Sequence, residues 1–480
     1  MNITYNLPAI GTQLVLGAGV ILVLLADLLT GKKNRDVAYQ TTLTVLVLAG
    51  IICVMKWGSA GAGFGGQVFG DGFASFFNLA FLAIAFLVVF NSPNYLKRNE
   101  IDHGEYYMLI LIAVLGMTFM SSAGDLLIFF LGLETMSISL YVLAGFHKSR
   151  ARSNESSLKY LLLGAFFTGF LLYGIALIYG QVGSTNLADI TSYLAGSANP
   201  LGGYMGVGLA LLLVGLLFKM AVVPFHFWSP DVYDGAPTPV TAFMSAAPKA
   251  AAFAAALRIF YDPAISLGLP WDKTLWIAAA LTITLGNFAA LAQSSIKRML
   301  AYSSITHAGY LMIGLAAGNE LGASGMLYYL FTYGFMNVGA FTIAWLVNRR
   351  GEGNYLLSDF AQLGSRNPVM ALLMSIFMLS LTGIPPLAGF FGKLYVFSAG
   401  VKAGLIWLVV IAVLNSVVSV FYYLRVMVIM YMREEEGLKD LEKAPTVAIT
   451  AILCGLVILL LGLFPGPLLD LARESVLSLL

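Results

Sequence analysis

The sequence predicts an all-α protein that crosses a membrane many times and contains two inverted five-helix repeats, each with a broken helix. Hydrophobic residues make up 59% of the 480 positions and charged residues only 10%. The mean hydropathy of +0.86 is far above that of an ordinary soluble domain. Long apolar runs follow one another along almost the whole chain, and two of them are interrupted by prolines.

The apolar runs define the expected membrane spans. A span needs about 20 mostly apolar residues, and about fourteen runs meet that requirement. The first run has no basic segment before it and no small-residue cleavage site, so we expect a retained helix and not a signal peptide. The expected spans cover residues 9–30, 37–56, 71–91, 106–121, 125–145, 158–181, 204–226, 238–260, 274–292, 298–316, 323–347, 368–399, 403–431 and 446–464.

The basic residues between the spans predict the orientation, because cytoplasmic loops are enriched in Lys and Arg. With both termini outside, seventeen basic residues fall in cytoplasmic loops and five on the outer face. This bias supports an even number of spans. The cytoplasmic set is Lys32, Lys33, Arg35, Lys97, Arg98, Lys148, Arg150, Arg152, Lys297, Arg298, Arg349, Arg350, Arg366, Arg425, Arg433, Lys439 and Lys443, and the outer set is Lys56, Arg258, Lys273, Lys402 and Arg473.

The two interrupted spans are expected to be broken helices. In the seventh, Pro224 follows Lys219, and in the twelfth, Pro385 and Pro386 precede Lys393. Proline removes a backbone donor and clashes with the preceding helical turn. Within a membrane, the freed backbone groups are tolerated only where protein or water satisfies them. Broken helices in both halves of a chain are typical of inverted repeats with a transport site between them.

The repeats divide the chain into four parts. If spans four to eight correspond to spans nine to thirteen, Tyr141 and Gly145 fall opposite Tyr310 and Gly314. This short similarity does not by itself exclude chance. The expected parts are an N-terminal three-helix segment (1–100), a first repeat (101–262), a second repeat (270–432) and a C-terminal helix (440–480).

Six of the ionisable residues in the expected spans stand out as a set. A charge at the bilayer centre costs on the order of 3 kcal/mol by insertion scales, so such residues usually have a function. Burial makes a lysine easier to deprotonate, and a nearby carboxylate opposes that effect. A carboxylate that approaches and leaves a buried lysine would therefore act as a switch. We interpret the six as a proton relay: Glu134, Lys219, Lys249, Lys393, Lys159 and His307.

Each of these residues also has a structural interpretation. Lys159 would extend its amine from the start of a span to the headgroups. Lys219 and Lys249 would be held by structural pairing, and Lys393 would cap the C-terminal end of a half-helix, where the helix dipole favours a cation. His307 would be a core histidine with satisfied hydrogen bonds.

Other function classes are disfavoured. The net charge is only +2 and the basic residues occupy short loops, so nucleic acid has no patch to bind. Cys53 and Cys454 stand alone in apolar runs, where we expect core residues, without the cluster that an iron–sulfur or zinc site requires. The glycine-rich stretch 61–66 is expected to be a loop and lacks the context of a dinucleotide fingerprint. We therefore expect no cofactor or metal on this chain.

Five long stretches carry a family resemblance: LGLETMSISLYVLAGF, NESSLKYLLLGAFFTGFLLYGIALIYG, FKMAVVPFHFWSPDVYDGAPTPVTAFMSAAPKAA, SSIKRMLAYSSITHAGY and GIPPLAGFFGKLYVF. They resemble the antiporter-like subunits of proton-pumping NADH:quinone oxidoreductase, respiratory complex I. Of the three types, the N type is the most similar in length, spans and the PDVYDGAPTPVTAF loop. Lysine at position 393 favours the N or L type over the M type. Ser295 stands where the family often has an acidic residue, which leaves the role of Lys297 open.

The resemblance implies a membrane-arm subunit that translocates protons while electrons pass from NADH to quinone on other subunits. NADH, FMN, iron–sulfur clusters and quinone would serve the whole complex. The implied partners are subunit M and small subunits such as K and J, in the bacterial inner membrane. Glu134 and Lys219 match the family's Glu/Lys pair, Lys249 its central lysine and Lys393 the residue of the second broken helix. The alternative is a subunit of a multi-subunit sodium/proton antiporter.

Overall fold

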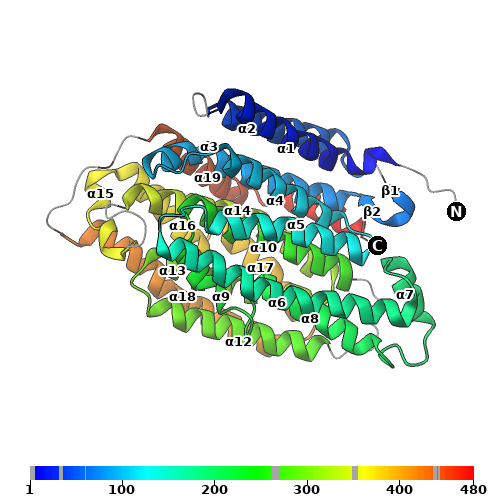
Figure 1. The fold of residues 1–480 in the computed structure, drawn as a ribbon. Helices are drawn as coiled ribbons and strands as arrows, with labels where there is room; N and C mark the ends of the chain where they lie inside the picture. Colours follow the sequence, from blue (N-terminus) through cyan, green and yellow to red (C-terminus); the bar gives the residue numbers. More distant parts are fainter. Residues whose placement is uncertain are drawn as a thin grey trace.

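The computed structural model describes residues 6–31, 36–59, 61–261, 271–348, 355–435, 441 and 444–479. Nearly all regular structure in this part of the chain is helical, which confirms the predicted fold class. The long helices run side by side as one bundle (Figure 1). Eleven helices among the described residues are long and apolar enough to cross a membrane, and Met205–Met220 and Pro368–Thr382 are shorter apolar helices.

The N-terminal helices lie along one side of the bundle (Figure 1). Between the second and third spans, the glycine-rich stretch forms an antiparallel hairpin in which Gly61 pairs with Gly70, so the expectation of a loop there was wrong. Gly65 and Gly66 have φ values of 70° and 84°, which glycine adopts readily, and so they close the turn. The elements are η1 (Leu7–Ile10), α1 (Gly11–Thr30), α2 (Asp36–Met55), β1 (Gly61–Gly63), η3 (Phe64–Gly66), β2 (Val68–Gly70) and α3 (Gly72–Arg98).

The remaining helices follow from α4 to the C-terminal region, and the division into two repeats stays a prediction. Each of the fourteen expected spans coincides with a helix or with a broken pair, while the number of membrane crossings stays a prediction. The elements are α4 (Gly104–Ser122), α5 (Leu126–Ala144), α6 (Ala151–Val182), α7 (Leu187–Gly196), α8 (Met205–Met220), α9 (Trp228–Gly235), α10 (Thr238–Phe260), α12 (Trp271–Leu291), α13 (Ile296–Ala317), α14 (Glu320–Val347), η4 (Leu357–Phe360), α15 (Leu363–Arg366), α16 (Pro368–Thr382), α17 (Ala388–Lys402), α18 (Ile406–Met432), α19 (Pro445–Leu463) and α20 (Gly466–Leu477).

The first predicted break separates α8 from α9. Ala221 adopts a left-handed conformation (φ 57°) directly after α8. The amide of Val222 then donates to the carbonyl of Leu217 at 3.0 Å, as in a Schellman helix end. The next amide, that of Val223, donates to Thr282 Oγ1 on α12 at 2.9 Å. A side chain of α12 therefore satisfies a backbone group that the break sets free.

The second predicted break, between α16 and α17, has the same backbone arrangement. Gly383 is left-handed (φ 89°), and the amide of Ile384 donates to the carbonyl of Leu379 at 3.1 Å. At the start of α17, the amide of Gly389 donates to Ser380 Oγ at 3.1 Å. Both broken helices thus end in one type of turn, with the freed groups paired inside the bundle.

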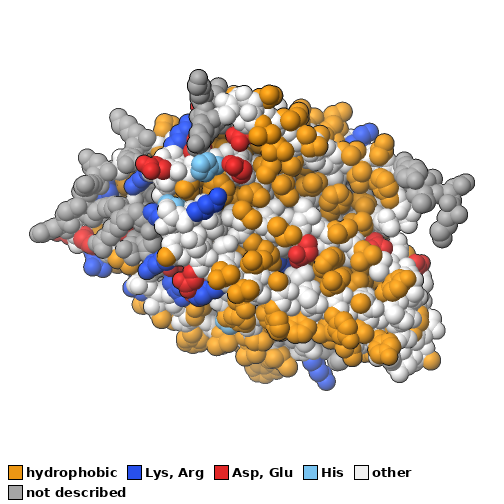
Figure 2. Space-filling model, viewed as in Figure 1, with side chains coloured by type: hydrophobic (Ala, Val, Ile, Leu, Met, Phe, Trp, Pro, Cys, Tyr) orange, Lys and Arg blue, Asp and Glu red, His pale blue; other side chains and the backbone are white. Residues whose placement is uncertain are grey.

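The two ends of the bundle differ in charge. Most of the charged side chains visible in Figure 2 lie toward the end that carries α15, whereas η1 and α20 lie toward the other end (Figure 1). Lys297 was predicted to be a loop residue, and this was wrong, since it is fully buried in the first turn of α13. Seven of the predicted loop residues lie outside the described residues: Lys32, Lys33, Arg35, Arg349, Arg350, Lys439 and Lys443.

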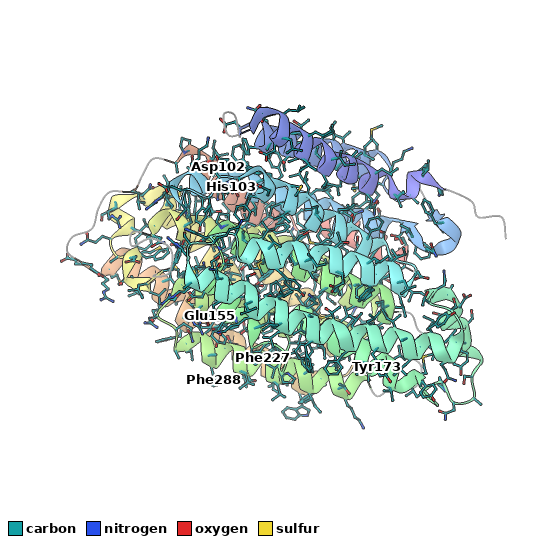
Figure 3. All side chains as sticks on the ribbon, in the orientation of Figure 1. Asp102, His103, Glu155, Tyr173, Phe227 and Phe288 are labelled. Atoms are coloured by element: carbon teal, nitrogen blue, oxygen red, sulfur yellow. The ribbon has the colours of Figure 1, made fainter. Side chains whose placement is uncertain are left out.

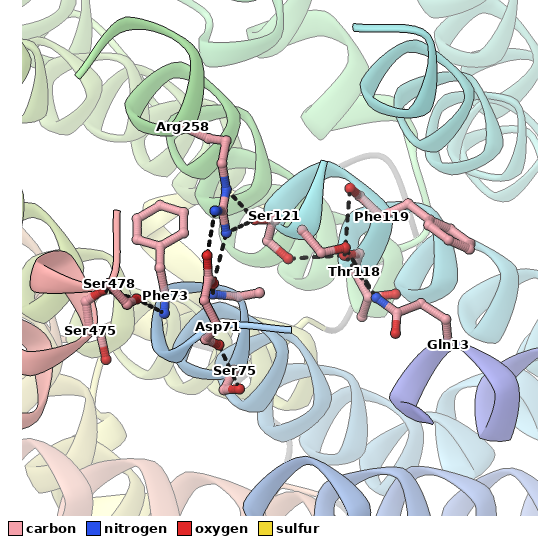
Figure 4. Close-up of polar contacts among 12 residues, drawn as sticks. Gln13, Asp71, Phe73, Ser75, Thr118, Phe119, Ser121, Arg258, Ser475 and Ser478 are labelled. Carbon is pink, nitrogen blue, oxygen red and sulfur yellow. Dashed lines mark hydrogen bonds and ion pairs between the residues drawn. The ribbon is translucent and has the colours of Figure 1, made fainter. Parts of the chain in front are cut away.

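A buried ion pair joins α3, α4 and α10 (Figure 4). Asp71 caps α3 by accepting a hydrogen bond from the amide of Ala74 at 2.8 Å. Arg258, near the end of α10, donates to the two Asp71 carboxylate oxygens at 2.5 and 2.9 Å. The same guanidinium donates to the Ser121 carbonyl at 2.7 Å and lies 4.8 Å from the Phe73 ring centre. One carboxylate and one guanidinium therefore hold three helix ends together.

Asp71→Asn should lower the thermal stability of the protein markedly. The Arg258 side chain is only 6% exposed and would lose its counter-charge, a change that costs about 3–5 kcal/mol at buried pairs. The matched control is Asp36→Asn, which removes a pair with Lys97 whose side chains are 57% and 53% exposed; such pairs contribute about 0–1 kcal/mol. Thermal unfolding in detergent compares the two. Equal midpoints would show that the Arg258–Asp71 pair does not hold the bundle.

Candidate functional site

Lys219 is buried in the last turn of α8. Its Nζ donates to Ser137 Oγ at 2.7 Å and to Tyr141 OH at 3.3 Å, both on α5. The ring centres of Tyr141 and Tyr160 lie 5.3 and 5.6 Å from Nζ, within the range of cation–π attraction. Hydroxyl oxygens and aromatic faces therefore surround this amine.

Glu134 lies on the same face of α5 as the two hydroxyls that hold Lys219, because Ser137 and Tyr141 follow it at helical spacings. Its Oε1 is buried and has no hydrogen-bond partner among the described residues. Within that part of the chain, no ion pair of 4.0 Å or less joins Glu134 to Lys219. The expected pair is therefore open in this structure, although Glu134 lies on the face of α5 whose hydroxyls hold Lys219.

Lys249 is buried in α10 and contacts α13. Its Nζ donates to the Ser304 carbonyl on α13 at 2.6 Å, and it also contacts Ser304 Oγ. The ring centre of Tyr333 lies 6.0 Å away. This lysine therefore joins α10 to α13 through neutral oxygen atoms.

His307 has a tyrosine hydroxyl on each ring nitrogen. Nδ1 lies 2.5 Å from Tyr329 OH, and Nε2 lies 3.0 Å from Tyr423 OH. The Tyr423 hydroxyl also lies 2.5 Å from Ser303 Oγ. A neutral imidazole has one donor and one acceptor nitrogen, and a hydroxyl takes either role. The surroundings of His307 thus satisfy a core histidine and also suit both of its tautomers.

Lys393 is buried in α17 beside the second break. Its Nζ donates to the Thr382 carbonyl at 2.7 Å and to Ser416 Oγ at 2.9 Å, and lies 4.8 Å from the Tyr310 ring centre. Thr382 is the last residue of α16. Lys393 therefore caps that half-helix, as its structural interpretation predicted, at a point where the helix dipole favours a cation.

One face of α13 connects the last three groups. Ser304 contacts Lys249, His307 lies between two tyrosine hydroxyls, and Tyr310 lies under Lys393. These residues follow at intervals of three, so they share a helix face and span about 9 Å along the axis. Helix α13 is therefore the element that brings Lys249, His307 and Lys393 into one row.

Lys159 belongs to a separate cluster of charges. Its Nζ lies 2.8 Å from Glu155 Oε1 on the preceding turn of α6 and 2.8 Å from Asp231 Oδ2 on α9. Asp231 also accepts from Arg298 on α13 at 2.9 Å. In Figure 3, Glu155 lies toward the end of the bundle that carries Asp102 and His103. The Lys159 amine is therefore held by two carboxylates beside a polar cavity of about 220 Å³.

The comparisons with known proteins agree with the resemblance seen in the sequence. The family described as NADH:quinone oxidoreductase/Mrp antiporter matches residues 123–419. A curated relative from Trichlorobacter lovleyi, named NADH-quinone oxidoreductase subunit N, is 47% identical over 98% of this chain and 97% of its own length. This chain belongs to the subunit N family of NADH-quinone oxidoreductases. It is therefore a membrane subunit of that enzyme.

Solved structures place the subunit among membrane complexes. A chain of respiratory complex I from Thermus thermophilus is 36% identical and superposes with a TM-score of 0.83, covering 96% of this subunit and 99% of that chain. A chain of the Mrp complex from Dietzia sp. has a TM-score of 0.85 over 98% of this subunit and 97% of that chain. At 21% identity, the Mrp likeness shows the fold alone.

Several contacts of the site could not be found from the subunit's sequence. Lys297 donates to the Ala236 carbonyl at 2.7 Å and lies 4.8 Å from the Tyr355 ring centre. Lys297 resembled a loop residue because it precedes Arg298 at the start of a span. The segments that bury it, around Ala236 and Tyr355, are distant in the sequence. Tyr329 and Tyr423 were missed because tyrosines in an apolar run look like core residues. Both cysteines are buried, as expected, and among the described residues no three His, Cys, Asp or Glu could hold a metal.

The charge cluster predicts a specific pH dependence of stability. Burial alone would raise the pKa of the Asp231 carboxyl. Hydrogen bonds from Lys159 and Arg298, together with the charges of these residues, lower this pKa by more than burial raises it, so the net shift is downward. A depressed carboxyl pKa stabilises the folded state above the ordinary value of about 3.9, and this contribution is lost only as the pH falls through the lower folded pKa. Asp231→Asn should therefore lower the unfolding midpoint by the same amount at about pH 8 and at about pH 5.

Thermal unfolding of the purified complex at both pH values measures this difference. Glu155→Gln is the matched control, because the Glu155 side chain is 62% exposed and, among the described residues, forms an ion pair only with Lys159 on its own helix. Its effect should be smaller than that of Asp231→Asn. A difference that shrinks between pH 8 and pH 5 would mean that another titrating group governs the cluster.

Proposed function

We propose that this subunit translocates protons across the bacterial inner membrane, coupled to electron transfer from NADH to quinone elsewhere in the complex. NADH, FMN, iron–sulfur clusters and quinone would be held by other subunits. The observation that carries the proposal is the set of buried lysines in both repeats, each held by neutral oxygens. The relay would comprise Lys159, Glu134, Lys219, Lys249, His307 and Lys393.

The contacts of the individual residues support the proposed order of the relay. Lys159 lies in the charged cluster and would supply protons from the cytoplasm. Lys219 would receive them next, and Glu134 would control its charge from the same face of α5. Approach of the carboxylate would favour the ammonium form of Lys219, and its withdrawal would favour release.

The second half of the relay would use the face of α13 described above. A proton from Lys249 would pass through Ser304 toward His307, which has a hydroxyl on both nitrogens. Lys393 would be the last station, over the ring of Tyr310. Tyr310 OH and Tyr333 OH are buried without a partner among the described residues, and buried polar groups of this kind are commonly bridged by water. Water would complete the gaps between the stations.

The proposed division into 1–100, 101–262, 270–432 and 440–480 is supported by two parallels between the repeats. Both breaks end in the same type of turn. The tyrosines aligned from sequence also occupy equivalent places, since Lys219 lies 5.3 Å from the Tyr141 ring centre and Lys393 4.8 Å from that of Tyr310. The repeats would therefore use one design for both broken-helix lysines.

The subunit would have both termini on the periplasmic side. The gathering of charge at the α15 end of the bundle supports a cytoplasmic position for that end. Subunit M and small subunits such as K and J would be its neighbours. If the protein instead served a sodium/proton antiporter, tagged subunit purified in mild detergent would carry no inhibitor-sensitive NADH:quinone reductase activity.

Replacing Lys219 should separate the relay from a purely structural role. Lys219→Arg keeps a positive charge but cannot release its proton at physiological pH, so proton pumping should fall about as far as in Lys219→Ala. Pumping is measured in inverted vesicles per electron transferred, with assembly checked by the yield of intact complex. Lys148→Ala, at an exposed lysine, should leave it unchanged. Normal pumping in the arginine variant would sink the assignment.

Tyr423→Phe should slow proton transfer without disturbing the fold. The change removes the hydroxyl that His307 Nε2 and Ser303 share, and leaves the ring in place. The control is Tyr328→Phe, because the buried Tyr328 hydroxyl donates to the Leu461 carbonyl at 2.8 Å and, among the described residues, no hydrogen bond joins it to Tyr423 or His307. We expect a several-fold lower rate and a shifted pH profile only for Tyr423→Phe. Identical profiles in the two variants would argue against a relay through His307.

A further inference from the structure

A groove leads from the surface of the bundle to Lys393. It has a volume of about 670 Å³ and runs between α17 and α18, beside the point where α16 ends. Its inner end holds the buried Lys393, whose Nζ donates to Thr382 and Ser416. Its walls include Leu394 and Val417, whose side chains are 42% and 64% exposed. The groove therefore opens sideways, onto the surface that would face the membrane.

The groove has a cation at its outer end. Lys402 lines it and is exposed in the last turn of α17. Nine residues of helix separate Lys402 from Lys393, which is about 13 Å along the axis. Val401 and Val413 add apolar wall between them, 51% and 47% exposed. A positive end, apolar sides and this length suit an amphiphile with an anionic head and a hydrocarbon tail.

We infer that an anionic phospholipid occupies this groove, with its headgroup at Lys402 and an acyl chain along α17 toward Lys393. The choice of a lipid rests on two features. The apolar walls lie in a helix pair that crosses the membrane, where acyl chains are the surrounding solvent. The ammonium group of Lys402 at the membrane surface attracts the negatively charged phosphate of an anionic headgroup by direct Coulomb attraction.

The bound acyl chain would also affect proton transfer at Lys393, and this part of the inference rests on the proposed function. The acyl chain covers the side of the groove from which water would reach Lys393 and its bonds to Thr382 and Ser416. A proton at Lys393 then leaves along the bundle and not sideways into the bilayer. The lipid therefore shields Lys393, the last residue of the proposed relay, from water on the membrane side.

Photolabelling of the intact complex tests the site. The complex is reconstituted with phosphatidylglycerol or phosphatidylcholine carrying a diazirine on the acyl chain, and labelled peptides are mapped by mass spectrometry. We expect several-fold more labelling of α17 and α18 peptides by phosphatidylglycerol. Val417→Trp should fill the groove and abolish this labelling. Leu414→Trp is the matched control, because Leu414 is 62% exposed on the same helix but does not line the groove.

The charge at the outer end is tested separately. Lys402→Gln should remove the preference for phosphatidylglycerol, whereas Lys273→Gln, at an exposed lysine of α12, should keep it. Equal labelling of Val417→Trp and the unmodified subunit would overturn the inference. So would equal labelling of the α17 and α18 peptides by the two lipids. Photolabelling requires no enzyme turnover, so a negative pumping experiment would not change the labelling result. A negative labelling experiment would likewise leave the proposed pumping function untouched.

Discussion

The rest of the structure depends on how the two helix breaks satisfy their backbone groups. A membrane offers no water to an unpaired amide or carbonyl, and each such group costs several kcal/mol. The partners come from inside the bundle: Thr282 of α12 accepts from the amide of Val223, and Lys393 donates to the carbonyl of Thr382. The first break is thus completed by a side chain of α12. Neither broken helix can hold the observed form without the helices packed around it.

This constraint also explains why the buried lysines sit where they do. Each break exposes carbonyls and leaves room for polar side chains in an otherwise apolar layer. Lys219 ends the half-helix before the first break, and Lys393 reaches back over the second. Lys249 has no break of its own and uses the carbonyl and hydroxyl of Ser304. The row of buried polar residues therefore begins and ends at the two helix breaks. Between the breaks, this row follows the regular helix α13.

The sequence predicted the buried lysines and the helix breaks well, but it did not predict the residues that contact them. Lys219, Lys249 and Lys393 stood out because charges are rare in apolar runs, and the breaks stood out because proline cannot continue a helix. Lys297 was misplaced, because a lysine beside an arginine at the start of a span reads as a loop residue. The tyrosines around His307 could not be identified from sequence, because their hydroxyls contact the histidine only when α13, α14 and α18 pack together. Local chemistry is readable from sequence, but contacts between distant helices are not.

The neutral partners of the three central lysines have a further consequence. Among the described residues, no carboxylate lies within 4.0 Å of Lys219, Lys249 or Lys393. Their positive charges are therefore not cancelled locally, and in a medium of low polarity like charges repel over long distances. In the proposed relay, each ammonium group would therefore raise the electrostatic cost of a further positive charge in the same bundle, so few of these amines would be charged at once.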